Sequence, residues 1–193
     1  ASPGSSVLAV PYYNVYTNMN DFDPIAIPGD FQGQASLQST SCMQGAEANA
    51  IVCMPEDCGV NVTLLAGFRY WSYYETLTFR TSSPFIPPQA VDIYKTRDSF
   101  DGRNNFYGGQ VGAKVEVKAN QFFLAVMGKV AVGTMHQRLG IEGHLKTNDF
   151  NGLGDPQKYP GGYFALPSNI GKHSRDVLAT IPEGKISFGF VSD

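Results

Sequence analysis

Histidine, aspartate and serine side chains are the first place to look for chemistry in this chain of 193 residues. His136 and His144 fall in a segment of alternating polarity, which places them roughly 27 Å apart along a strand. Two ligands at that separation cannot share a metal ion, and His173 falls in a polar, loop-like segment. The serines occur without the G-x-S-x-G spacing of a nucleophile elbow. We therefore expect that the chain is not an enzyme.

Clusters of oxygen-bearing side chains make calcium the one cofactor to consider. The segments DSFDG and NDFNGLGD place glycines beside Asp98, Asp101, Asp149 and Asp155. Neither segment reproduces a full EF-hand loop. Asp and Asn are also common in ordinary turns, where they hydrogen-bond to their own backbone. Calcium binding and plain turn chemistry both stay open as interpretations.

The three cysteines are Cys42, Cys53 and Cys58. Cys53 and Cys58 flank the short segment MPED, so a disulfide between them is feasible in an oxidising compartment. Sequence does not determine connectivity, and three free thiols are an equally good interpretation. The spacing matches no common pattern of zinc ligands.

The segment 106–145 indicates which elements carry the charged side chains. Apolar or small residues occupy one parity, and Gln, Lys and Glu occupy the other. A period of two is typical of a β-strand with one apolar and one polar face. The pattern breaks at Ala119-Asn120 and resumes at once, and asparagine tolerates the positive φ of a tight turn. The segment is therefore predicted to be a β-hairpin.

The whole chain predicts about six strands in a single domain over residues 1–193. Short connections at 54–59 and 119–120 alternate with long polar connections near 11–30, 81–105 and 147–173. The apolar parity switches around 41–45 and again after Thr134. Such a switch predicts either a β-bulge or a change of environment along one long strand.

Local alternation does not say which face lies inside. In a soluble sandwich the apolar face is the core, whereas in a membrane barrel it faces lipid and the polar face lines the lumen. The strict alternation of short and long connections favours the barrel, which has short periplasmic turns and long extracellular loops. The predicted fold class is an all-β, antiparallel, up-and-down β-barrel of the membrane type.

The composition is compatible with this class. Charged residues make up 16% of the chain, below the roughly 25% of an average soluble domain. No apolar run approaches the roughly 20 residues of a transmembrane helix. The net charge of −3 and the lack of a basic stretch argue against a nucleic-acid partner. The expected partners are outer-membrane lipid and other copies of the chain.

The polar parity carries the predicted pore chemistry. In a barrel its side chains would face the lumen, and their mixed signs would give weak selectivity or a salt-bridged plug. In a sandwich the same side chains would form the solvated outer face. The predicted lumen-facing residues are Arg69, Gln110, Lys114, Glu116, Lys129, Glu183 and Lys185.

An ordered set of short segments along the chain resembles a known family. The segments are GAEAN (45–49), LLAGFRYW (64–71) with Glu75, FDGRNNFYGGQVGA (100–113), GKVAVG (128–133), IEG (141–143), PSNIG (167–171) followed by Arg175-Asp176, and IPE (181–183). Together they resemble the type-seven putative beta-barrel porins of the bacterial outer membrane. VLAVPYYN (7–14) also resembles a segment of that family.

The resemblance implies a barrel in the bacterial outer membrane, with a function in passive diffusion or envelope structure. Members of the family extend further at both ends, so the chain is expected to be truncated at both ends. Six strands are fewer than the eight of the smallest single-chain barrels. Either the barrel is incomplete or it closes with strands from other copies. The alternative is a secreted, all-β structural or adhesive subunit of a surface layer or fibre, located at the cell surface, whose open edges pair with neighbouring copies.

Overall fold

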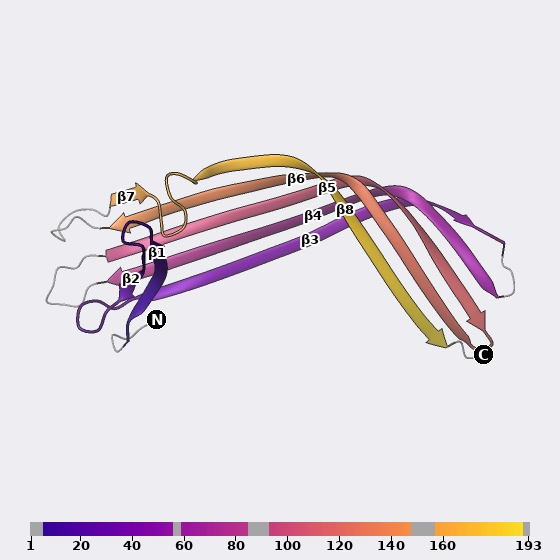
Figure 1. Ribbon diagram of the computed structural model, residues 1–193, viewed down its shortest axis with the longest axis horizontal. Coiled ribbons are helices and arrows are strands. Elements are labelled where there is room, and N and C mark those ends of the chain that lie inside the picture. Colours follow the sequence, from indigo (N-terminus) through magenta and orange to yellow (C-terminus); the bar gives the residue numbers. More distant parts are fainter. Residues whose placement is uncertain (1–5, 56–58, 85–92, 148–156, 191–193) are drawn as a thin grey trace. The chain divides into compact units, whose positions relative to one another are not determined.

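The computed structural model describes residues 6–55, 59–84, 93–147 and 157–190, and these residues form long β-strands (Figure 1). The strands are β1 (Leu8–Asn14), β2 (Met19–Ala26), β3 (Gln34–Cys53), β4 (Val60–Pro84), β5 (Ile93–Ala119), β6 (Phe122–Thr147), β7 (Gln157–Pro160) and β8 (Gly171–Phe190). The larger sheet has the order β3-β4-β5-β6, and both β7 and β8 pair with β6. β1 and β2 form a second sheet. The prediction of an all-β, antiparallel fold is confirmed.

The chain divides into two compact units, and each contains a part of every long strand. Unit 1 comprises residues 1–41, 75–102 and 139–173. Unit 2 comprises residues 42–74, 103–138 and 174–193. Whether they form one barrel domain, as predicted, stays a prediction.

The two predicted short turns lie between strand ends. β5 ends at Ala119 and β6 begins at Phe122. Asn120 between them has a φ of 53°, which asparagine adopts at lower cost than most residues. The hairpin predicted over 106–145 is therefore present. Around the other predicted turn, β3 ends at Cys53 and β4 begins at Val60.

The register between β3 and β4 bears on the predicted parity switch at 41–45. The amide of Gln32 donates to the carbonyl of Pro84, and the amide of Met54 donates to the carbonyl of Val62. These two bonds, at opposite ends of the strand pair, have the same register. A net β-bulge between them would shift the register by one residue. The register thus gives no sign of a net β-bulge, and a change of environment along β3 stays a prediction.

The prediction of an irregular loop over 11–30 is wrong. β1 and β2 form an antiparallel hairpin in which Tyr12 pairs with Asp21 and Asn14 with Met19. The Asn14 side chain accepts hydrogen bonds from the amides of Tyr16 and Thr17 at the turn. Most of this hairpin is exposed on both faces, so its sequence has none of the apolar alternation by which strands are recognised.

The other two predicted loops are shorter than expected. β4 continues to Pro84 and β5 begins at Ile93, while β7 and the start of β8 fall within 147–173. The strands were missed here because polar pairs replace apolar ones. Buried Thr81 and Thr96 hydrogen-bond to each other through their hydroxyls at 2.6 Å. In the described residues there are thus eight strands, two more than predicted.

A buried carboxylate organises the core of unit 1. Asp98 on β5 has no exposed surface. Its oxygens accept hydrogen bonds from the amides of Tyr163, Phe164 and Ala165, at 3.1, 3.1 and 2.8 Å. Phe79 contacts the rings of Tyr163 and Phe164, and Ala165 is completely buried. Asp98 therefore provides three of the hydrogen bonds that hold the segment after β7 onto the sheet.

Candidate functional site

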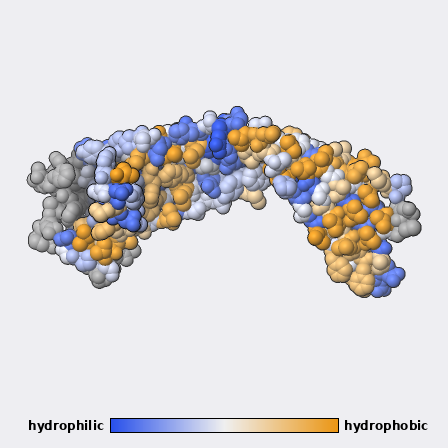
Figure 2. Space-filling model, in the orientation of Figure 1, coloured by the Kyte–Doolittle hydropathy of each residue, from blue (hydrophilic) through white to orange (hydrophobic). Residues whose placement is uncertain are grey.

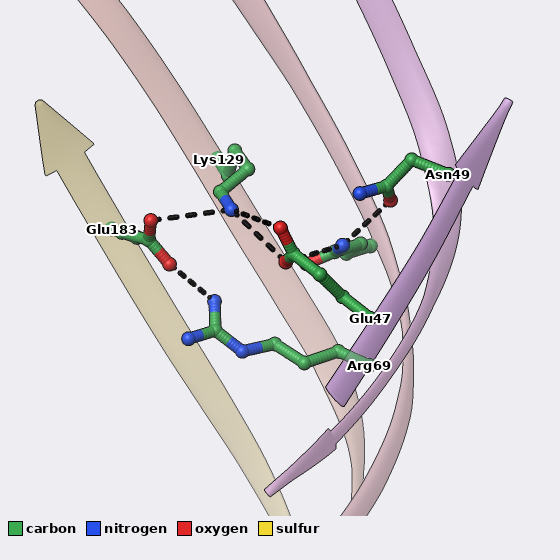
Figure 3. Close-up of polar contacts among 6 residues, drawn as sticks. Glu47, Asn49, Arg69, Lys129 and Glu183 are labelled. Carbon is green, nitrogen blue, oxygen red and sulfur yellow. Dashed lines mark hydrogen bonds and ion pairs between the residues drawn. The ribbon is translucent and has the colours of Figure 1, made fainter. Parts of the chain in front are cut away.

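Unit 2 contains a cluster of ion pairs that links four strands (Figure 3). The Lys129 ammonium on β6 lies 3.0 Å from both carboxylate oxygens of Glu47 on β3. The same ammonium lies 3.2 Å from Glu183 on β8. Arg69 on β4 donates to the second oxygen of Glu183 at 2.6 Å. Two cations and two carboxylates make the cluster formally neutral.

Two amide side chains extend this network. Gln110 on β5 donates from Nε2 to Glu47 at 2.9 Å and to Asn49 at 2.6 Å. Gln110 is 3% exposed. Its Oε1 is buried and has no hydrogen-bond partner among the described residues. With Gln110 included, every long strand of the sheet contributes to the network.

Glycines make room for these long side chains. A Cβ at Gly112 on β5 would lie 2.7 Å from Cγ of Lys129, and a Cβ at Gly67 on β4 would lie 2.4 Å from Oδ1 of Asn49. The two glycines thus occupy positions where any other residue would displace the side chains that reach across β4 and β5. They are part of how the sequence builds the cluster.

A pocket of about 260 Å³ borders the cluster in unit 2. Glu47, Arg69, Lys129 and Glu183 line it together with Gly45 and Trp71. The Trp71 ring stacks on that of Tyr73, with centroids 5.9 Å apart. The site therefore combines charged hydrogen-bonding groups with an aromatic surface.

The two faces of the sheet in unit 2 have opposite character. We call the face with Glu47, Arg69, Gln110, Lys129 and Glu183 the cluster face, and the face with Val111, Val115, Val126, Val130 and Val132 the valine face. On the cluster face Lys129 is 8% exposed and Ala131 is buried, whereas on the valine face Val130 is 38% and Val132 48% exposed. The apolar parity is thus the exposed one, whereas Gln110, Lys129 and Ala131 on the polar parity are buried.

The valine face is broad. It also carries Phe68, Leu124, Leu178, Ile186 and Phe188, and all of them are exposed. Figure 2 shows apolar side chains gathered over the ends of β6 and β8. Soluble proteins rarely expose contiguous apolar patches larger than a few hundred Å². Exposed apolar faces of this kind mark contacts with another protein or with a membrane.

Four of the seven predicted lumen residues meet in the cluster: Arg69, Gln110, Lys129 and Glu183. Lys114 and Glu116 instead form a separate pair at 2.7 Å on β5, joined by Lys118. Lys185 is exposed on β8, two residues after Glu183. Whether any of them lines a lumen stays a prediction.

Glu47 and Asn49 belong to the site, but sequence reasoning did not select them. Both occupy the polar parity of the GAEAN segment. That parity was a usable signal for placing them with Arg69 and Lys129. The pairing with Lys129 could not be read from it, because β3 and β6 are not neighbours in the sheet.

The calcium candidates have other partners or lie outside the described residues. The oxygens of Asp98 accept hydrogen bonds from three backbone amides, as described above. Asp101 accepts a hydrogen bond from the Thr76 hydroxyl at 2.8 Å. Asp149 and Asp155 lie outside the described residues. Within the part that the structure describes, no group of three or more His, Cys, Asp or Glu side chains could hold a metal ion.

The cysteines leave the predicted disulfide open. Cys42 and Cys53 are exposed and form no disulfide within the described residues. Cys58 lies outside the described residues. The Cys53–Cys58 bond therefore stays a prediction.

Long antiparallel strands with an exposed apolar face, and with Lys129 and Gln110 buried on the opposite face, define an all-β protein of inverted polarity in unit 2. No helix among the described residues is long and apolar enough to span a membrane. The chain belongs to the family described as putative beta barrel porin-7, whose sequence model matches residues 1–191. The family resemblance is thereby confirmed. No curated protein has significant similarity to the chain.

Proposed function

We propose that the chain forms the wall of a β-barrel in the bacterial outer membrane, with the valine face in lipid and the cluster face toward the lumen. The observation that carries this proposal is the inverted polarity of unit 2. Exposed valines alternate with the nearly buried Lys129 and Gln110 along β5 and β6. In a membrane barrel the apolar parity faces lipid and the polar parity faces the interior.

The length of the apolar stretch supports this proposal. On β5 the exposed apolar residues extend from Tyr107 to Val117, and on β6 from Phe122 to Val132. A transmembrane strand needs roughly 9–11 residues to cross the hydrocarbon core. Tyr70 and Tyr107, whose ring centroids are 5.1 Å apart, lie at the end of this stretch away from the Asn120 turn. Aromatic rings concentrate at such interfaces.

The proposed activity is passive diffusion of small polar solutes, without catalysis. Arg69, Lys129, Glu47 and Glu183 compensate one another's charge. A lumen lined in this way attracts neither cations nor anions strongly, so it favours weak ion selectivity. The family description, which names a porin, supports the same function.

The first test is extraction. A membrane barrel leaves the bacterial envelope only with detergent, and it migrates differently on a gel before and after heating. A protein that is fully soluble after lysis without detergent contradicts the proposal.

The second test places a charge on the valine face. Val126→Lys should impair folding into lipid vesicles by about 2–4 kcal/mol, because Val126 lies near the middle of the apolar stretch and a charge near the membrane midplane is costly. Thr134→Lys is the matched control, since Thr134 lies on the same strand face beyond the valines. It should cost about 1 kcal/mol or less. Equal and small effects of both substitutions point to a water-exposed face.

The edges of the sheet favour a second candidate function. Among the described residues, β3 and β8 each pair along their length with one neighbour only. Open edges can pair with other copies, which a secreted structural or adhesive subunit would use. Detergent-free solubility together with growth of long assemblies would support this candidate. A monomer at high concentration would contradict it.

A further inference from the structure

A pocket of about 360 Å³ in unit 1 is strongly basic. Arg80, Lys95, Arg97 and Lys146 line it together with His144. The other lining groups include the hydroxyls of serine and threonine. None of the described residues that line it is acidic. Four of the 14 Lys and Arg residues of an acidic chain are thus concentrated around one pocket.

Strand register places these cations directly opposite one another. The Thr78–Ser99 and Thr81–Thr96 contacts fix the register of β4 and β5, and this register sets Arg80 opposite Arg97. A Cβ at Gly140 on β6 would lie 3.9 Å from Cβ of Asp101 on β5, so these two residues lie opposite each other. The same register sets His144 opposite Arg97 and Lys146 opposite Lys95.

The short strand β7 adds a fifth cation. Lys158 on β7 pairs with Lys146 on β6. The pocket is therefore bordered by two adjacent rows: one holds Arg80, Arg97 and His144, and the other holds Lys95, Lys146 and Lys158. The rows are roughly 7 Å apart, the rise of two residues along a strand.

Such an arrangement is unfavourable without a counter-ion. Like charges directly opposite on neighbouring strands destabilise a sheet. In the described part of the chain, none of these five Lys and Arg side chains forms an ion pair. Asp98 is adjacent to Arg97 on β5, so its side chain lies on the other face of the sheet, where its oxygens accept hydrogen bonds from backbone amides. The nearest carboxylate on β6 is exposed Glu142, two residues before His144.

The protonation of His144 reflects the same crowding. Burial lowers its pKa, and the positive charges of Lys158 and Arg97 lower it further, against the opposing effects of Asp98 and Glu142. A neutral imidazole at near-neutral pH still offers one N–H donor to a ligand.

We infer that this pocket binds a multivalent oxyanion of the phosphate class, with pyrophosphate as the simplest representative. Guanidinium forks and ammonium groups are the donors that bind phosphate oxygens most strongly. Two rows roughly 7 Å apart suit two linked phosphate groups better than one. The inference concerns unit 1 alone and does not depend on the proposed membrane function.

The phosphate of a lipid headgroup presents the same oxygens to these cations as a soluble phosphate compound does. Binding of free pyrophosphate in the absence of any lipid, in the titration that follows, distinguishes the soluble source.

The test is calorimetric titration of the purified, full chain with sodium pyrophosphate in phosphate-free buffer at constant ionic strength. In the Arg97→Gln/Lys146→Gln variant, affinity should fall about tenfold for each cation removed, because a charge-assisted contact contributes about that much. The control variant is Lys118→Gln/Lys172→Gln, which removes two exposed cations elsewhere and should bind normally. Equal weakening in both variants, or no binding to the unmodified chain, overturns the inference.

A stability measurement distinguishes a ligand site from a merely structural cluster. Without pyrophosphate, the Arg97→Gln/Lys146→Gln variant should unfold at a higher temperature than the unmodified chain, since repulsion is relieved. With pyrophosphate, only the unmodified chain and the control should be stabilised, by mass action. A pyrophosphate-induced increase that persists in the variant overturns the inference.

Discussion

The ammonium of Lys129 contacts Glu47 across two intervening strands. Lys129 lies on β6 and Glu47 on β3, with β4 and β5 between them in the sheet, yet Nζ is 3.0 Å from both carboxylate oxygens. Strands in a sheet are about 4.8 Å apart, so the two side chains together span roughly 14 Å. Both must lie across the sheet, and Lys129 does so over Gly112.

Removal of the central cation should therefore be costly. Lys129→Met leaves Glu47 without its cation and Glu183 with only Arg69. Loss of one partner of a fully buried pair costs roughly 3–5 kcal/mol, and because both glutamates are about a third exposed we expect about 2 kcal/mol. Urea unfolding of the purified protein measures this cost. Lys114→Met, which breaks an exposed pair, should cost about 1 kcal/mol or less. Equal costs contradict the assigned importance of Lys129.

Two glycines of the hairpin should differ sharply when replaced by alanine. A Cβ at Gly112 would lie 2.6 Å from the carbonyl oxygen of Gly128 and 2.7 Å from Cγ of Lys129, whereas a Cβ at Gly128 meets nothing within 4 Å. Gly112→Ala should destabilise the protein by about 1–3 kcal/mol, as overpacking does. Gly128→Ala should be neutral or slightly stabilising. Denaturation midpoints of the two variants test this. If Gly112→Ala is tolerated, the Lys129 side chain can reach across the sheet without passing over residue 112.

Asp98 should control the local stability of the segment after β7. Asp98→Asn replaces one acceptor oxygen by an NH₂ group that faces backbone donors. Leaving such buried groups unsatisfied costs about 1–3 kcal/mol. Hydrogen exchange at the amides of Tyr163, Phe164 and Ala165 should accelerate strongly. The control is Asp176→Asn, on an exposed carboxylate bound to His136, which should leave these amides protected. Unchanged exchange in Asp98→Asn contradicts the anchoring function.

Tyr163 should make stability depend on pH in the alkaline range. Burial raises the pKa of its phenol to about 12, and the nearby Asp23 carboxylate contributes in the same direction. A raised folded-state pKa favours the protonated form, so its stabilisation is complete below the unfolded pKa of about 10 and is lost as the pH rises toward 12. The unfolding temperature, measured at several pH values between about 9 and 12 to span these pKa values, gives the loss of stability. Tyr163→Phe should lose less stability over the same interval, and an identical decline would assign the effect to other groups.

The central hairpin was predictable because its alternation is local. Phe122 to Val132 present one apolar parity, and Asn120 provides the turn. The polar parity then placed Arg69, Gln110, Lys129 and Glu183 on one face without further information. The β1–β2 hairpin was not predictable in this way, since most of it is exposed on both faces and its turn is marked only by asparagines: Asn14 through its side chain and Asn18 through its φ of 55°.

The ion pairs and the basic pocket depend on register, which the sequence does not contain. Arg80 and Arg97 are far apart in sequence, and nothing local indicates that they lie opposite each other. The same holds for Glu47 and Lys129, whose contact also needs Gly112 on another strand. Periodicity assigns a side chain to a face, but only the pairing of strands determines its neighbours.

The charge cluster also constrains the order in which the chain assembles. Arg69 and Glu183 are separated by 114 positions, so their bond closes one of the longest loops in the chain and forms late for entropic reasons. Until β8 has docked beside β6, Lys129 has Glu47 as its only anionic partner in the cluster and Arg69 lacks Glu183. A nascent sheet without β8 therefore keeps the Arg69 guanidinium on the cluster face without its Glu183 partner. Docking of β8 brings Glu183 to both Arg69 and Lys129. The charges of the cluster are therefore balanced only when this strand has joined the sheet.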